Sequence, residues 1–297
     1  MARLTETQFV ISQFHFPGVN FPFDRFELDS NVCFRRNGEE ECIACIATEE
    51  DEDMLKNEAE QTVLEIAAIY ALLTPFTFRI SPGISHSLGS SEELGRHRLY
   101  EAKLQVRFVE SEEKLRQYSE EVSTSWQKTR GAWTKAREML HGKKFLELAL
   151  FYYYRSGLGT QAVYGGSIDE AFIDAAIGLE ALYNDSPQDI AYKLATRAAL
   201  LLSCSDKEDE NDVFKSLKDL YKKRNNIVHG IEREEVEWKD HELIRKFLRS
   251  SLRSCLALAV ERDKMRIIDL IDRAIARPGA RRELTEAIQK GITYLGL

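Results

Sequence analysis

The chain of 297 residues carries 49 acidic side chains against 41 lysines and arginines, so its formal net charge is −8 at pH 7. This charge disfavours a protein that coats nucleic acid electrostatically, because such binding needs lysine and arginine to neutralise phosphates. The hydrophobic content of 43% is that of a globular protein, and no apolar run has the length of a membrane span.

The amino terminus and the cysteines predict a cytoplasmic protein. The opening residues MARLTETQ lack the basic start and apolar stretch of a secretion signal. The five cysteines form an odd set without framework spacing, which fits reduced thiols inside a cell. Cys42 and Cys45 have metal-ligand spacing, but strand alternation would point their thiols to opposite faces, so a zinc site and ordinary strand packing both stay open.

The first part of the chain, to about residue 110, has the mixed pattern of an α+β domain. One helix is predicted over Asp53–Leu73. The predicted strands are Gln8–Phe14, Phe26–Arg35, Glu41–Ala47, Phe76–Ile80 and Leu99–Val109. The role of this domain does not follow from its sequence.

From residue 111 onward nearly every segment has helical periodicity. The predicted helices are Ser111–Leu140, Lys143–Tyr154, Ile168–Tyr183, Pro187–Cys204, Asn211–His229, Lys239–Lys264 and two short ones near the carboxy terminus. Pro187 is expected in a first turn and Gly230 as a left-handed cap. We therefore expect an α+β domain over residues 1–141, with helix 111–140 as a connector, followed by an all-α helical bundle over residues 142–297.

The most informative segment ends the helix predicted over Asn211–His229. On a helical projection Arg224 falls in the apolar stripe, between Leu217 and Val228. Burying a guanidinium without partners is costly, so Arg224 requires an acidic partner, a subunit interface or a bound anion. His229 follows five residues later, and on a straight helix its side chain diverges from that of Arg224 by about 140°.

The segment RNNIVHG, residues 224–230, resembles the Arg-x4-His signature of the HEPN superfamily of helical ribonucleases, and in particular its Apea-like branch. The segments IGLEALY (177–183) and AYKLATRAALLL (191–202) resemble the helices that precede this motif in the family. The resemblance covers roughly residues 142–262 and none of the first half of the chain. It implies a HEPN-like helical bundle that dimerises.

The resemblance implies a metal-independent endoribonuclease without a cofactor, in which the ribose 2′-hydroxyl of RNA attacks the adjacent phosphate. His229 is the candidate for moving the proton, because imidazole titrates near neutral pH. Arg224 is the candidate for stabilising the charge on the phosphate oxygens. Asn225 matches the polar residue that the family favours after its arginine and takes a positioning role. A two-fold dimer, in which two motif helices line one cleft, would bring the divergent side chains together.

Supporting residues lie on the same helices. Glu180 matches an acidic position that recurs in the family's second helix, where it either holds Arg224 or forms a merely structural ion pair. Asn226 is a further supporting candidate. Arg197 resembles a recurrent arginine of the branch and is expected to be structural.

A basic flank accompanies the motif. Lys215, Lys218 and Lys222 project to the same side of the helix as His229, and they form either an RNA-facing edge or a solvated basic face. Ile231 stands where some toxins of the superfamily carry a tyrosine that a nucleotidyltransferase modifies, so that adenylylated type is not expected. The remaining histidines are interpreted as surface or satisfied residues: His15, His86, His97, His141 and His241.

Two functional hypotheses stay open. The first is an endoribonuclease in defence or stress response, whose amino-terminal domain senses a trigger, restrains the nuclease or binds a regulatory protein. The second is a non-catalytic dimeric interaction module. In that case His229 is an ordinary histidine of a last helical turn and Arg224 an ordinary member of a buried ion pair.

Overall fold

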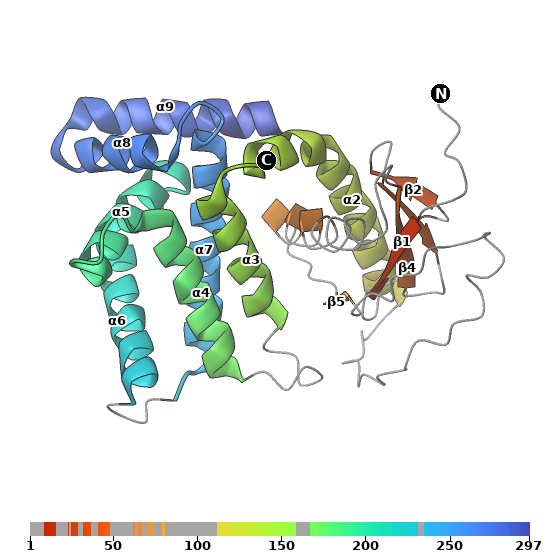
Figure 1. The fold of residues 1–297 in the computed structure, drawn as a ribbon, viewed down its shortest axis with the longest axis horizontal. Coiled ribbons are helices and arrows are strands. Elements are labelled where there is room, and N and C mark those ends of the chain that lie inside the picture. The colour runs from red at the N-terminus through yellow and green to blue at the C-terminus, as the bar shows by residue number, and fades with distance from the viewer. Residues whose placement is uncertain are drawn as a thin grey trace. The chain divides into compact units, whose positions relative to one another are not determined.

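The computed structural model describes five short strands and scattered residues between positions 9 and 80, and then residues 112–158, 167–230 and 235–297. Most of the described residues are helical. The chain divides into two compact units, residues 1–134 and 135–297, and helix α2 (Glu112–Leu140) runs from the first into the second (Figure 1). No helix in the described part of the chain is both long enough and apolar enough to cross a membrane.

The described strands of the first unit form an antiparallel sheet in the order β2-β3-β4-β1-β5. Their bounds are β1 Phe9–His15, β2 Arg25–Glu27, β3 Val32–Arg36, β4 Glu41–Ala47 and β5 Arg79–Ile80. The prediction of one strand over Phe26–Arg35 was wrong, because β2 and β3 are two strands that pair antiparallel. The reason is turn chemistry: Asp29, Ser30 and Asn31 between them are residue types that favour turns.

The described residues within the helix predicted over Asp53–Leu73 are helical, and they contribute to the core of the first unit. Tyr70 is fully buried, and its ring centre lies 4.7 Å from that of Trp126 on α2. Phe26 of β2 packs against the same indole at 5.6 Å. The strand predicted over Leu99–Val109 lies outside the described residues.

In the second unit, α4 has the predicted bounds and α6 begins one residue early. The helices are α3 Lys144–Leu158, α4 Ile168–Tyr183, α5 Ile190–Ser205, α6 Glu210–His229, α7 Trp238–Leu258, α8 Lys264–Ala276 and α9 Pro278–Leu295. Helix α4 packs against α3, α5, α6 and α7, while α8 and α9 lie side by side across one end of the bundle (Figure 1).

Local sequence signals set the helix ends. Ser167 and Glu170 form a reciprocal capping box at the start of α4, in which each side chain accepts a hydrogen bond from the other residue's N–H group. The Asp209 carboxylate accepts a hydrogen bond from the N–H of Asp212 and begins α6. Gly230 ends that helix with a positive φ of 63°, as predicted for a left-handed cap.

Several helix boundaries differ from the prediction, among them the end of α3, which lies at Leu158 rather than Tyr154. Helix α5 begins at Ile190, so Pro187 precedes it rather than lying in its first turn. Helix α7 ends at Leu258, and Asp263 starts α8 by accepting a hydrogen bond from the N–H of Arg266. The prediction of a single helix over Lys239–Lys264 was wrong: the break holds Ala259, Val260 and the charged residues Glu261, Arg262 and Asp263, with neither glycine nor proline to mark it. Of the two helices expected to be short, α9 spans 18 residues.

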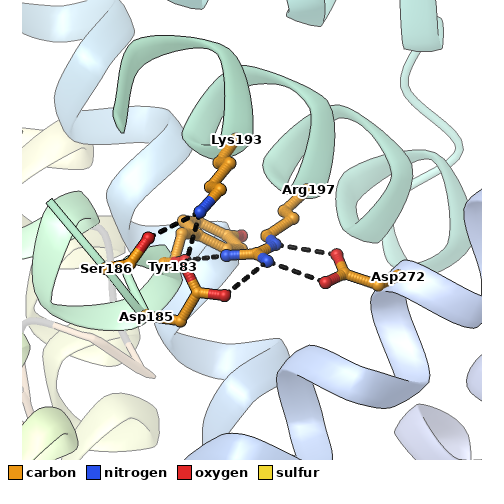
Figure 2. Close-up of polar contacts among 6 residues, drawn as sticks. All are labelled: Tyr183, Asp185, Ser186, Lys193, Arg197 and Asp272. Carbon is orange, nitrogen blue, oxygen red and sulfur yellow. Dashed lines mark hydrogen bonds and ion pairs between the residues drawn. The ribbon is translucent and has the colours of Figure 1, made fainter. Parts of the chain in front are cut away.

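Arg197 joins four segments of the second unit and has the contacts of a structural residue (Figure 2). Its Nε and Nη2 donate to the two carboxylate oxygens of Asp272 on α8, at 2.8 and 2.7 Å. Nη1 donates to the carbonyl oxygen of Tyr183 at 2.6 Å, and Nη2 also reaches Asp185 at 3.0 Å. The hydrogen bond from Arg197, with a second from Lys193, holds the pKa of Asp185 well below its usual range.

Candidate functional site

The candidate site lies on α6, which packs against α4, α5 and α7. The buried residues of this helix are Val213, Leu217, Leu220, Tyr221 and Asn226. Val228, predicted on the apolar stripe, is 47% exposed. The predicted stripe is therefore wrong at Val228, and at Arg224 the neighbouring helix α4 presents the carboxylate of Glu180 rather than an apolar side chain.

The Arg224 guanidinium finds an acidic partner within its own chain. Its Nη2 lies 3.2 Å from Oε1 of Glu180 on α4. Its Nη1 donates a hydrogen bond to Oδ1 of Asn225, also at 3.2 Å. The side chain of Arg224 remains 18% exposed, so the structure brings Arg224, Asn225 and Glu180 together at a surface that solvent reaches.

Tyr221 completes this group, although the sequence had marked it only as an apolar position. Its hydroxyl donates a hydrogen bond of 2.9 Å to the same Glu180 Oε1 that faces Arg224. Its ring centre lies 5.5 Å from Cζ of Arg224, within the range of a cation–π contact. Burial, and then the Glu180 carboxylate, raise the pKa of the Tyr221 hydroxyl well above its ordinary value, so the hydroxyl remains a donor. The available signal was the spacing of three residues from Arg224, which places both on one helix face.

Arg224 retains unused hydrogen-bond donors. A guanidinium has five N–H groups, and the contacts to Glu180 and Asn225 occupy two of them. Its Nε is buried and has no hydrogen-bond partner among the described residues. The buried Nε is closed to solvent, so the donor capacity that a phosphate oxygen could use lies on the Nη1 and Nη2 N–H groups that Glu180 and Asn225 leave unpaired.

His229 is the last residue of α6 and is exposed. Within the described part of the chain its imidazole has no hydrogen bond or ion pair, and none joins it to Arg224. A single protomer therefore does not bring the two predicted catalytic side chains together, as their divergence around the helix predicts. Asn226 is buried instead of facing the same surface, and it does not lie with Asn225 at the exposed site.

The three predicted RNA-binding lysines, Lys215, Lys218 and Lys222, are exposed on α6. The Lys218 amine lies 5.6 Å from the ring centre of Phe214, and no acidic side chain holds any of the three within the described chain. Lys223, by contrast, pairs with Asp240 of α7 at 2.6 Å. The lysines therefore form a basic face whose role the geometry alone leaves between solvation and RNA contact.

A second polar group lies between α3 and α7. Nε2 of His241 lies 2.9 Å from the carbonyl oxygen of Ser156, while its Nδ1 has no hydrogen-bond partner among the described residues. His241 is thus buried but only half satisfied, which corrects its interpretation as a surface or satisfied residue. The neighbouring Arg245 guanidinium stacks on the ring of Tyr153 at 4.5 Å. Burial, together with the positive charge of Arg245, lowers the pKa of His241.

The described ranges contain no group of three histidine, cysteine or acidic side chains that could hold a metal ion. Comparisons of the chain with protein-family models, with curated proteins and with solved structures each found no match. The HEPN resemblance therefore rests on the residues of the chain itself and stays a prediction.

Proposed function

We propose that the second unit is a HEPN-type, metal-independent endoribonuclease that acts as a homodimer in a defence or stress response. The observation that carries the proposal is the Arg224 group. This arginine is oriented by Glu180, Asn225 and Tyr221, remains partly exposed, and keeps unpaired Nη N–H groups for an anion. The exposed His229 on the same helix, without a hydrogen-bond partner in the described chain, supplies an imidazole, the side chain most often used for general acid–base catalysis.

The proposed reaction is an internal transfer at phosphorus. A base removes the proton from the ribose 2′-hydroxyl, whose oxygen forms a bond to the adjacent phosphorus. The bond from phosphorus to the 5′-oxygen breaks, and that oxygen takes up a proton. The products are a 2′,3′-cyclic phosphate and a 5′-hydroxyl, and no oxidant or cofactor is consumed.

His229 and Arg224 have separate roles in this scheme. His229 transfers a proton, which typically contributes on the order of 10² to 10⁴ in rate. Arg224 binds the phosphate oxygens as negative charge builds on them, and loss of such a donor costs on the order of 10² to 10³. The two side chains diverge on one helix, so the complete site requires α6 of a second protomer, related by a two-fold axis. In a dimer, the imidazoles of two protomers can serve as base and acid.

The exposed last turn of α6 is the part available for that contact. Val228 is 47% exposed beside His229, and burying its side chain between protomers would favour association. Glu180 and Asn225 then position the guanidinium from within each chain, while Lys215, Lys218 and Lys222 offer phosphate contacts along the same helix. The first unit is proposed as an α+β domain that receives a trigger or a regulatory protein.

The test is cleavage of mixed cellular RNA by purified protein in EDTA, with chemical identification of the product ends. Cyclic phosphate ends that disappear in both Arg224→Ala and His229→Ala would support the proposal. The matched controls are Arg282→Ala on α9 and His141→Ala in the turn after α2, because both side chains are exposed and lie outside the site. Cleavage that persists in His229→Ala, or equal losses in the controls, would contradict it.

A second candidate, a non-catalytic dimeric module, is favoured by one observation. Glu180 already neutralises Arg224 within the chain, as it would in a purely structural ion pair. On this alternative no variant cleaves RNA, while Val228→Asp converts a dimer into a monomer in sedimentation experiments. Both hypotheses expect Val228→Asp to weaken the dimer, so RNA cleavage by the parent protein is the result that would exclude the alternative.

A further inference from the structure

Glu180 contacts Arg224 in a way that differs from the contact between Asp272 and Arg197 in the same unit. Asp272 uses both carboxylate oxygens on Arg197, and so occupies Nε and Nη2 together. Glu180 faces only Nη2 of Arg224, through a single oxygen, and leaves the buried Nε without a partner in the described chain. The two-bond arrangement is the stronger form of such a pair, so something must hold Glu180 out of it.

Tyr221 is the group in position to do so. Its hydroxyl donates to Glu180 Oε1 at 2.9 Å, and that is the same oxygen that approaches Arg224 at 3.2 Å. The hydrogen bond fixes the direction of the carboxylate and occupies part of the acceptor capacity of this oxygen. Beneath it, the Tyr221 ring supports the guanidinium at 5.5 Å.

We propose that Tyr221 is a positioning residue that diverts Glu180 from full pairing with Arg224, and so keeps the guanidinium able to bind an RNA phosphate. The inference rests on the proposed function for the identity of the anion. It assigns separate roles to two residues: Glu180 orients Arg224, and Tyr221 limits how far Glu180 neutralises the charge of the guanidinium. Without the hydroxyl, the carboxylate is free to rotate and occupy Nε and Nη2 together, as Asp272 does on Arg197.

The first test reads the guanidinium directly and needs no RNA. In protein labelled with ¹⁵N-arginine, the Nε–H proton signal of Arg224 should move downfield in Tyr221→Phe, toward the signal of Arg197, because it gains a charge-assisted hydrogen bond. Tyr192→Phe is the matched control, since the Tyr192 ring is exposed on α5 and contacts Phe214 instead. An Arg224 signal that does not move in Tyr221→Phe would overturn the inference, whatever the protein does with RNA.

The second test measures the dissociation constant for a 2′-O-methyl oligoribonucleotide, which binds without offering a nucleophile. Tyr221→Phe should weaken binding about threefold to tenfold, the scale of one net hydrogen bond. Glu180→Gln removes the neutralising charge and should change affinity in the opposite direction. If Tyr221 and Glu180 were merely structural, Tyr221→Phe and Glu180→Gln would change the RNA dissociation constant in the same direction.

Tyr183→Phe separates positioning from stability. The Tyr183 hydroxyl donates a buried hydrogen bond of 2.7 Å to Ser251, away from Arg224, so its removal should lower stability but leave RNA affinity unchanged. Affinity that falls equally in Tyr183→Phe and Tyr221→Phe would overturn the inference. If the parent protein neither binds nor cleaves RNA, the proposed function fails, and the Arg224 signal alone then decides whether Tyr221 controls the pairing of Glu180.

Discussion

Arg197 and Asp272 meet in a two-bond ion pair that joins α5 to α8, although 75 positions separate the two residues in the chain. The guanidinium is 5% exposed, whereas the carboxylate is 43% exposed. Burial opposes the charge of Arg197, yet its hydrogen bonds to Asp272 and Asp185 raise its pKa above the ordinary value. The pair is therefore a strong local link, although water partly screens the charge of the Asp272 carboxylate.

Removal of this carboxylate should destabilise the second unit measurably. Asp272→Ala leaves the buried guanidinium with Asp185 and one carbonyl, and we expect the free energy of unfolding to fall by about 1–2 kcal/mol. Asp269→Ala on the same helix is the control, because Asp269 pairs with the exposed Arg273 and should cost less than about 0.5 kcal/mol. Urea unfolding measures both, and equal losses would show that the link is no stronger than a surface pair.

His241 should make stability depend on pH in the slightly acid range. Its pKa is lowered in the folded chain, so below about pH 6.5 the unfolded chain binds more protons and stability falls as pH falls. Between pH 7.5 and 5.5 the loss from this residue is at most about 1.4 kcal/mol. His241→Gln should reduce the pH dependence of urea unfolding across this window, while His141→Gln, at an exposed turn, should leave it unchanged.

The crossing of α7 and α9 should not tolerate a side chain at Gly291. A Cβ there would overlap the carbonyl group of Ala257, which is backbone and cannot rotate away. Gly291→Ala should therefore destabilise the second unit by about 1–3 kcal/mol, even though alanine favours helix. Gly279→Ala, in the first turn of α9 with open space around it, should be neutral or slightly stabilising. Thermal unfolding of the two variants compares them, and similar midpoints would contradict a close helix contact.

The salt dependence of RNA binding can show whether the basic face of α6 contacts RNA. If Lys215, Lys218 and Lys222 contact RNA phosphates, replacing all three with alanine should weaken binding and reduce the slope of log affinity against log salt by about 0.7 for each lost contact. Replacing three exposed arginines of the same unit, Arg266, Arg277 and Arg282, gives the matched change in net charge. Equal effects in the two triple variants would indicate a general charge effect and a merely solvated face.

The sequence predicted the helices best where caps and apolar spacing agreed. The bounds of α4 follow from its periodicity, and the structure adds the capping box of Ser167 and Glu170; the predicted Gly230 cap is confirmed by its positive φ. The break between α7 and α8 was not predicted because neither glycine nor proline marks residues 259–263, and the capping role of Asp263 depends on where α8 begins. β2 and β3 were merged because turn residues were counted as part of a strand.

The candidate site was predictable only in part. Helical spacing identified Arg224 as a charge in need of a partner, and the family resemblance suggested Glu180. Helical spacing alone could not reveal that Val228 lies at the protein surface, so the prediction that it belongs to the buried apolar stripe was wrong. The hydroxyl of Tyr221 was overlooked because the apolar stripe counts its ring alone, whereas its hydrogen bond depends on the position of α4.

The contact between Arg197 and Asp272 also limits how far the second unit can be truncated from its carboxy-terminal side without losing its fold. The HEPN resemblance ends near residue 262, yet α8 and α9 pack on α5 and α7, and α8 supplies the carboxylate that Arg197 needs. A fragment that stopped at the end of the resemblance would expose apolar surface and leave the interior guanidinium of Arg197 with only Asp185 and one carbonyl as partners. The smallest fragment expected to fold independently thus extends to the last turn of α9, well beyond the part that carries the motif.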